Sequence, residues 1–121
     1  MSDPLTAEII GAAIEVHRIL GPGLLERIYE DALCIELELR GLTVERQAER
    51  DVIYKGHTLR GQRIDLLVAN EIVVEVKSLS KLPDVALAQT LSYLRATGLQ
   101  RGLLINFGLP RLVDGIKRVV V

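Results

Sequence analysis

The sequence has no tryptophan, one cysteine and few aromatic residues, and each shortage excludes a class of protein. A single cysteine, Cys34, cannot form an internal disulfide, which is typical of proteins in a reducing compartment. With one cysteine and two histidines, the chain also has no Cys/His cluster for zinc. One phenylalanine and three tyrosines are too few for a platform on which nucleic-acid bases stack. Cys34 lies in a helical pattern, which predicts a buried, small apolar side chain rather than a nucleophile.

Long apolar runs and an excess of charge are also missing. No stretch approaches the roughly 18 consecutive apolar residues of a membrane span, and the N-terminus lacks the basic and then apolar layout of a signal peptide. We therefore expect a cytoplasmic protein that makes no contact with a membrane. The 15 basic and 16 acidic residues give a net charge of −1, whereas proteins that hold duplex nucleic acid by its phosphates are usually basic. Binding to nucleic acid would have to come from a local patch, a metal ion or a partner.

The remaining features predict one domain, residues 1–121, of the mixed α/β (α+β) class. The chain is 49% hydrophobic, which is enough for one core. Apolar residues recur with the period of a helix over residues 4–20, 24–40 and 83–97. Strand patterns cover residues 43–49, 51–55, 63–68, 72–77, 102–107 and 116–121, the last as an edge or dimer-forming strand. The expected order is two helices, four strands, one helix and two strands, with the helices flanking a mixed central sheet.

Helical spacing also predicts which side chains are buried. In the second helix the expected core stripe is Leu25, Ile28, Ala32, Ile35 and Leu39. In the third helix Val85, Ala88, Leu91, Leu94 and Arg95 form one stripe. His17 lies near the end of the first helix, where we expect a hydrogen-bonded or dipole-favoured structural residue rather than a catalytic one.

The most informative stretch is residues 63–77, where three ionisable side chains interrupt two apolar strands. Residues two apart in a strand point to the same face, so Glu75 and Lys77 are neighbours. A short hairpin brings Asp65, on the preceding strand, beside the backbone of Glu75. Strands this apolar usually lie in a sheet covered on both faces, where an unpaired charge costs several kcal/mol. The three groups must therefore be paired with one another or bound to a metal.

Two interpretations explain these residues. One is structural: Lys77 forms a buried ion pair with Asp65 or Glu75, or extends to solvent from an edge strand. The other is a metal site, because two carboxylates, the main-chain carbonyl of Val76 and waters are an oxygen-rich set suited to Mg²⁺ or Mn²⁺. Lys77 would then orient the attacking water or help to deprotonate it.

Two helical pairs accompany this stretch. Glu26 and Tyr29 share a face near the start of the second helix, where a carboxylate also stabilises the helix N-terminus without any further role. Gln89 and Tyr93 are four residues apart and project together from the third helix. That helix follows the Glu75 strand directly and can cross over it, although the pair is also consistent with an ordinary surface contact.

Five blocks of sequence, in the right order, resemble one known family. They are Val16 to Tyr29 with the signature Gly23-Leu24-Leu25-Glu26-Arg27-Ile28-Tyr29, the Asp65 strand, Glu75-Val76-Lys77, Gln89 to Tyr93, and Gly102 to Phe107. Over residues 8–120 the chain is similar to the GxxExxY proteins, and its order of elements resembles the restriction-endonuclease-like core of the PD-(D/E)xK nuclease superfamily. His17 belongs to the family string without an assigned role. One departure is Ile64, which stands where the superfamily motif has proline.

The resemblance implies a role for each matched position. Asp65 and Glu75 would be the two acidic metal ligands, and Lys77 the motif lysine. Glu26 resembles the acid on the first core helix that touches the metal directly or through water. Gln89 and Tyr93 resemble the Q-x-x-x-Y helix of the superfamily's exonuclease-like members.

Together these features predict a Mg²⁺- or Mn²⁺-dependent nuclease that hydrolyses phosphodiester bonds of nucleic acid, most simply DNA held by a local patch. The alternative is a non-catalytic or partner-dependent module that acts as a homodimer or as part of a larger complex. The slight negative charge and the apolar end Val119-Val120-Val121 favour that alternative.

Overall fold

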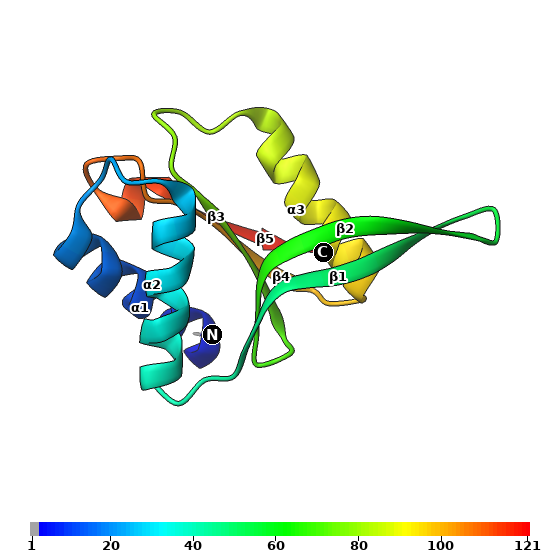
Figure 1. Cartoon of the computed structure of the whole chain (residues 1–121), viewed down its shortest axis with the longest axis horizontal. Coiled ribbons are helices and arrows are strands. Elements are labelled where there is room, and N and C mark those ends of the chain that lie inside the picture. The colour runs from blue at the N-terminus through cyan, green and yellow to red at the C-terminus, as the bar shows by residue number, and fades with distance from the viewer. Residues whose placement is uncertain (1–2) are drawn as a thin grey trace.

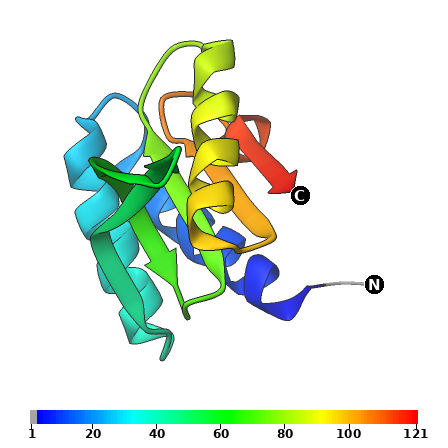
Figure 2. The same cartoon turned by 90° about the vertical axis from the view of Figure 1, so that its right-hand side faces the viewer.

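The structure is a computed structural model that describes residues 3–121, and it builds one five-stranded sheet covered by helices on both faces (Figure 1). The elements are α1 (Pro4–Leu20), α2 (Glu26–Leu39), β1 (Val44–Tyr54), β2 (His57–Val68), β3 (Ile72–Lys77), α3 (Asp84–Thr97), β4 (Arg101–Asn106), a 3-10 turn η1 (Leu112–Gly115) and β5 (Ile116–Val120). Helices α1 and α2 lie on one face of the sheet and α3 on the other (Figure 2). The predicted fold class, a mixed sheet flanked by helices, is confirmed.

The strands follow one another across the sheet in chain order, β1-β2-β3-β4-β5. Only β3 and β4 are parallel, and α3 makes the crossover between them, as a parallel connection requires. Side chains at 72, 74 and 76 of β3 enter the core under α1 and α2, whereas Val73 enters the core under α3. β3 therefore lies in the middle of the protein and is buried on both faces, as its continuous apolar sequence predicted.

One strand fewer precedes α3 than the sequence suggested. The strands expected at 43–49 and 51–55 form one continuous strand, β1, because a register shift between Arg50 and Val52 breaks the alternation without ending the pairing. Past this point β1 and β2 continue as a two-stranded ribbon that extends beyond the sheet (Figure 1). Its turn is at Lys55 and Gly56, which both have positive φ, as in the two-residue turns that match strand twist.

The predicted core stripe of α2 was wrong by one position around the helix. The side chains that α2 buries are Tyr29, Glu30, Leu33, Cys34 and Leu37, whereas Leu25, Ile28, Ile35 and Leu39 are exposed and Ala32 is half-buried. Tyr29 decides the orientation, because its ring stacks on Phe107 with centroids 4.7 Å apart. Its hydroxyl donates to the Gly21 carbonyl and accepts from the Leu24 N–H, so the polar end of the ring is also satisfied.

In α3, Leu94 is the one member of the stripe marked by helical spacing that is buried. The buried set is Ala86, Thr90, Tyr93 and Leu94, while Val85 is 68% exposed. Small residues of α3 face the sheet here. The Thr90 side chain packs against Gly102 of β4, where a Cβ atom would lie 3.2 Å from the Thr90 methyl group. The close approach of α3 to β4 therefore selects a stripe that apolar periodicity does not mark.

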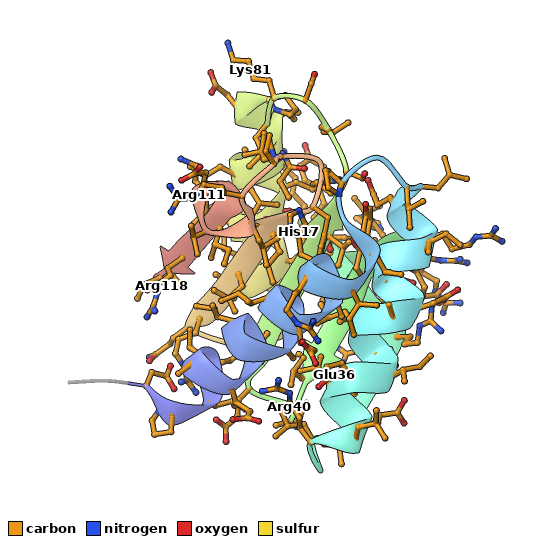
Figure 3. The ribbon with its side chains drawn as sticks, turned by 90° about the vertical axis from the view of Figure 1, so that its left-hand side faces the viewer. His17, Glu36, Arg40, Lys81, Arg111 and Arg118 are labelled. Atoms are coloured by element: carbon orange, nitrogen blue, oxygen red, sulfur yellow. The ribbon has the colours of Figure 1, made fainter. Side chains whose placement is uncertain are left out.

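Other local predictions are confirmed. The Cys34 thiol is buried, and burial with the neighbouring Glu38 carboxylate raises its pKa to about 11, which makes it a poor nucleophile. His17, labelled in Figure 3, has its Nε2 atom 2.9 Å from the Leu109 carbonyl oxygen, so it ties α1 to the loop after β4. β5 is an edge strand. Among the helices of residues 3–121, none combines the length and apolarity that crossing a membrane requires.

Candidate active site

Asp65 and Glu75 meet where the β2–β3 ladder ends. The paired residues run from Val68 opposite Ile72 to Leu66 opposite Val74, and the same register places Asp65 opposite Glu75. At that step the backbone N–H groups of Asp65 and Val76 bond to side-chain carboxylates instead of to backbone carbonyls of the opposite strand. The Asp65 N–H donates to a Glu75 carboxylate oxygen at 3.0 Å, and the Val76 N–H donates to an Asp65 carboxylate oxygen at 2.9 Å. Each acid is thus fixed by the backbone of the opposite strand.

The strand β2 rolls over at this point. Leu66 lies in the core under α1 and α2, but Ile64 lies in the core under α3, although residues two apart normally share a face. The neighbouring strand, β1, changes face at the same place. Gln47 of β1 has a φ of 48°, and Ala48, which lies opposite Ile64, also belongs to the core under α3. Asp65 sits at the step between the two halves of the strand.

Glu75 is the buried acid of the pair. It is 3% exposed and points to the α3 side of the sheet, since it alternates with Val74 and Val76 of the opposite core. Burial, then the charge of Asp65 and the hydrogen bond between the two, raise the pKa of Glu75 to about 9, and Lys77 only partly offsets this. With no metal bound, Glu75 therefore retains its proton at neutral pH.

Glu26 brings a third acid toward the same place from α2. It is the first residue of that helix and is half-buried. Burial raises its pKa most, the charges of Asp65 and Glu30 raise it further, and Lys77 lowers it. Glu26 therefore lies within electrostatic reach of both Asp65 and Lys77. The Ser78 hydroxyl, donating to the Leu24 carbonyl at 2.6 Å, ties the start of α2 to the end of β3.

The two residues predicted on α3 have different surroundings. Tyr93 is buried, and its pKa is raised to about 12 by burial and then by the nearby Glu75 and Asp65 carboxylates, so its hydroxyl stays neutral beside the acids. Gln89 lies one turn earlier and is exposed, and within residues 3–121 its side chain has no hydrogen-bond partner. The structure thus brings Tyr93 to the acidic pair and leaves the Gln89 amide at the surface.

Asn106 is a site residue that the sequence patterns did not single out. It lies opposite Lys77 in the parallel β3–β4 pair and is fully buried. Its side chain accepts from the Leu79 and Gly108 N–H groups at 2.9 and 3.0 Å, and donates to the Leu79 carbonyl at 2.9 Å. It therefore fixes the loop that leaves Lys77. The available signal was a polar residue at the end of an otherwise apolar strand.

The donor set fits a hard cation that keeps other ligands. Within residues 3–121 no three His, Cys, Asp or Glu side chains are close enough together to hold a metal ion. Asp65 and Glu75 supply two carboxylates, and strand alternation points the Val76 carbonyl to the same side as its N–H, toward Asp65. Magnesium is commonly bound by one or two carboxylates together with waters and substrate phosphates. A divalent cation would also relieve the repulsion that raises the pKa of Glu75.

Comparison with known proteins gives one match. The model of the family described as PD-(D/E)XK nuclease superfamily matches residues 3–119, nearly the whole chain. No curated protein and no solved structure matches the chain significantly. The match is to the superfamily as a whole, and the narrower GxxExxY resemblance stays a prediction.

Proposed function

Because the chain belongs to the PD-(D/E)XK nuclease superfamily, we propose that it is a divalent-metal-dependent nuclease that hydrolyses phosphodiester bonds of DNA. Nucleases of this superfamily generally use divalent metal ions. The observation that carries the proposal is the reciprocal pair of bonds between Asp65 and the Glu75 strand. A buried carboxylate beside a second acid is costly to maintain, and a strongly perturbed pKa of this kind is a marker of functional sites.

In this proposal Asp65, Glu75 and the Val76 carbonyl hold one Mg²⁺ or Mn²⁺ ion, and Glu26 contacts it directly or through water. Such an ion supplies Lewis-acid stabilisation of the phosphate charge and a more acidic water. The backbone bonds at 3.0 and 2.9 Å hold both carboxylates in place before any ligand arrives. The chain therefore does not have to order these side chains during the reaction.

Lys77 is the proposed catalytic amine. It shares a strand face with Glu75, is half-buried, and lies near Glu26. Its ammonium can orient the attacking water, take part in its deprotonation, and offset negative charge that develops on the phosphate. Tyr93 would restrain the Glu75 side chain from the α3 side. The exposed Gln89 would contact a phosphate of the bound strand or orient Lys77.

Replacing Lys77 by methionine tests the chemistry separately from the metal. Met keeps most of the side-chain length but removes the charge, so we expect nicking of supercoiled plasmid in Mg²⁺ or Mn²⁺ to fall by roughly 10²–10⁴-fold, the usual contribution of general acid–base catalysis. Calorimetric titration with Mn²⁺ should still show binding. Lys117→Met, at an exposed position on β5, is the matched control. Nicking by Lys77→Met at the wild-type rate would remove the lysine from the mechanism.

The β5 edge favours a second candidate, a homodimer or partner-dependent module. Val120 in β5 is 71% exposed and Val121, just after it, is 56% exposed; within residues 3–121 no strand pairs with the outer edge of β5. Light scattering after size exclusion gives the mass in solution. A monomer that binds Mn²⁺ and nicks DNA by itself would count against the partner-dependent module.

A further inference from the structure

The β1–β2 ribbon is the largest feature that the proposed chemistry leaves unused. Every residue from 51 to 61 is exposed, and the ribbon projects past α3 into solvent (Figure 1). An unsupported two-stranded hairpin is at best marginally stable in water, so an exposed length that continues beyond α3 is unexpected unless it has a partner. At its base the ribbon is held by the Gln62 amide, which donates to the Ser92 hydroxyl on α3 at 2.9 Å.

The charge of the ribbon is opposite to that of the whole chain. Residues 51–64 contain three basic residues, Lys55, Arg60 and Arg63, one histidine, His57, and one acidic residue, Asp51. The chain as a whole has 16 acidic against 15 basic residues. Arg63 is paired with Glu49 at 3.2 Å, but the salt bridges within residues 3–121 include none to Lys55 or Arg60. The outer ribbon is therefore a local basic patch on a slightly acidic protein, and it complements a polyanion.

The ribbon also leads directly to the candidate site. It runs along β2 from His57 at the tip to Asp65 at the site, eight residues that span roughly 25 Å at the rise of a strand. That length corresponds to about seven base pairs of a duplex. A nucleic acid held by the ribbon would thus pass the acids at its base.

We propose, resting on the nuclease function above, that the β1–β2 ribbon enters the major groove of duplex DNA and that Lys55 and Arg60 contact its phosphates. The major groove of B-form DNA is about 12 Å wide and admits a two-stranded β-ribbon, whereas that of an A-form RNA duplex is too narrow and deep. The exposed apolar side chains near the tip suit contacts with thymine methyl groups or sugars. They are Ile53, Tyr54 and Leu59, at 65%, 58% and 50% exposure.

Binding of a fluorescent 20-base-pair DNA duplex in EDTA, followed by anisotropy, tests the proposal without any cleavage. The double variant Lys55→Ala/Arg60→Ala should bind roughly sixtyfold more weakly at about 0.1 M salt, because affinity varies with salt concentration to the power −0.9 for each phosphate contact, so each lost contact lowers it about eightfold. For the same reason the slope of log affinity against log salt should fall by about 2.

The matched control is Arg111→Ala/Arg118→Ala, which removes the same charge from exposed positions near η1 and β5 (Figure 3). It should leave affinity and salt slope at wild-type values. Duplex RNA and single-stranded DNA of the same sequence should bind the wild type more weakly than duplex DNA. Equal binding by the ribbon variant and the control would overturn the proposal, as would equal affinity for the RNA duplex.

The ribbon and the nuclease proposal fail separately in this design. A wild type that binds duplex DNA through Lys55 and Arg60 but cuts nothing in Mg²⁺ or Mn²⁺ would reject the nuclease function and keep the ribbon. A wild type that cuts DNA, with a ribbon variant that binds and cuts equally well, would keep the nuclease function and reject the ribbon.

Discussion

Replacing Asp65 by asparagine should abolish metal-dependent cleavage while leaving the protein folded. The asparagine oxygen can still accept from the Val76 N–H, so the bond that closes the β2–β3 step is kept. The negative charge that a cation needs is lost. Since a bound metal contributes several kcal/mol to phosphate chemistry, we expect plasmid nicking to fall by at least about a thousandfold.

Two measurements accompany this variant. Calorimetric titration with Mn²⁺ should show a loss of affinity of more than about tenfold, and circular dichroism should show wild-type helix content and melting in EDTA. Asp114→Asn, an exposed acid in η1, is the matched control and should behave as wild type in all three assays. Undiminished nicking by Asp65→Asn would reject the assignment of Asp65 to the metal site.

Replacing Glu75 by glutamine should stabilise the metal-free protein at alkaline pH. The folded protein keeps the Glu75 proton up to about pH 9, whereas the unfolded chain releases it near the ordinary value of 4.5. Between these values the folded state binds more protons, so the free energy of unfolding falls as pH rises, by at most about 1.4 kcal/mol per pH unit. The stabilising contribution is complete below pH 4.5 and lost as pH passes 9. Glutamine stays neutral and does not repel Asp65.

The test is thermal unfolding in EDTA at pH 5, 7 and 9. The melting temperature of the wild type should fall relative to Glu75→Gln as pH rises, by about 4 °C for each kcal/mol in a chain of this size. Asp114→Asn should follow the wild type. If wild type and Glu75→Gln show the same pH dependence, the buried pair does not hold the proton. The same variant should be inactive in nicking, so stability and activity move in opposite directions at this residue.

This opposition follows from what surrounds the carboxylate pair. A buried acid at 3% exposure, beside a second acid, is stable only while it is protonated or bound to a cation. A sheet without a ligand would be better served by an apolar residue at position 75, like its neighbours Val74 and Val76. Glu75 therefore lowers the stability of the metal-free protein at the position where the β2–β3 ladder ends.

The sequence by itself determined the helix boundaries and the pairing of Glu75 with Lys77 on one strand face. Asp3 and Pro4 begin α1, Gly21 ends it, and Gly98 ends α3 in a left-handed conformation, so local backbone chemistry is enough to place these boundaries. Period-two alternation likewise put Glu75 and Lys77 on one face of β3. Each of these inferences depends only on residues close together in the chain.

The tertiary structure alone decided how those elements face one another. Two overlapping apolar stripes run along α2, and the stacking of Tyr29 on Phe107 selects the one that the sequence pattern did not favour. The roll of β2 at Asp65 depends on Gln47 in the neighbouring strand, and the length of the free ribbon depends on where α3 stops supporting it. Such choices rest on contacts between residues distant in sequence, because periodicity defines the faces of an element but not the neighbour that each face will meet.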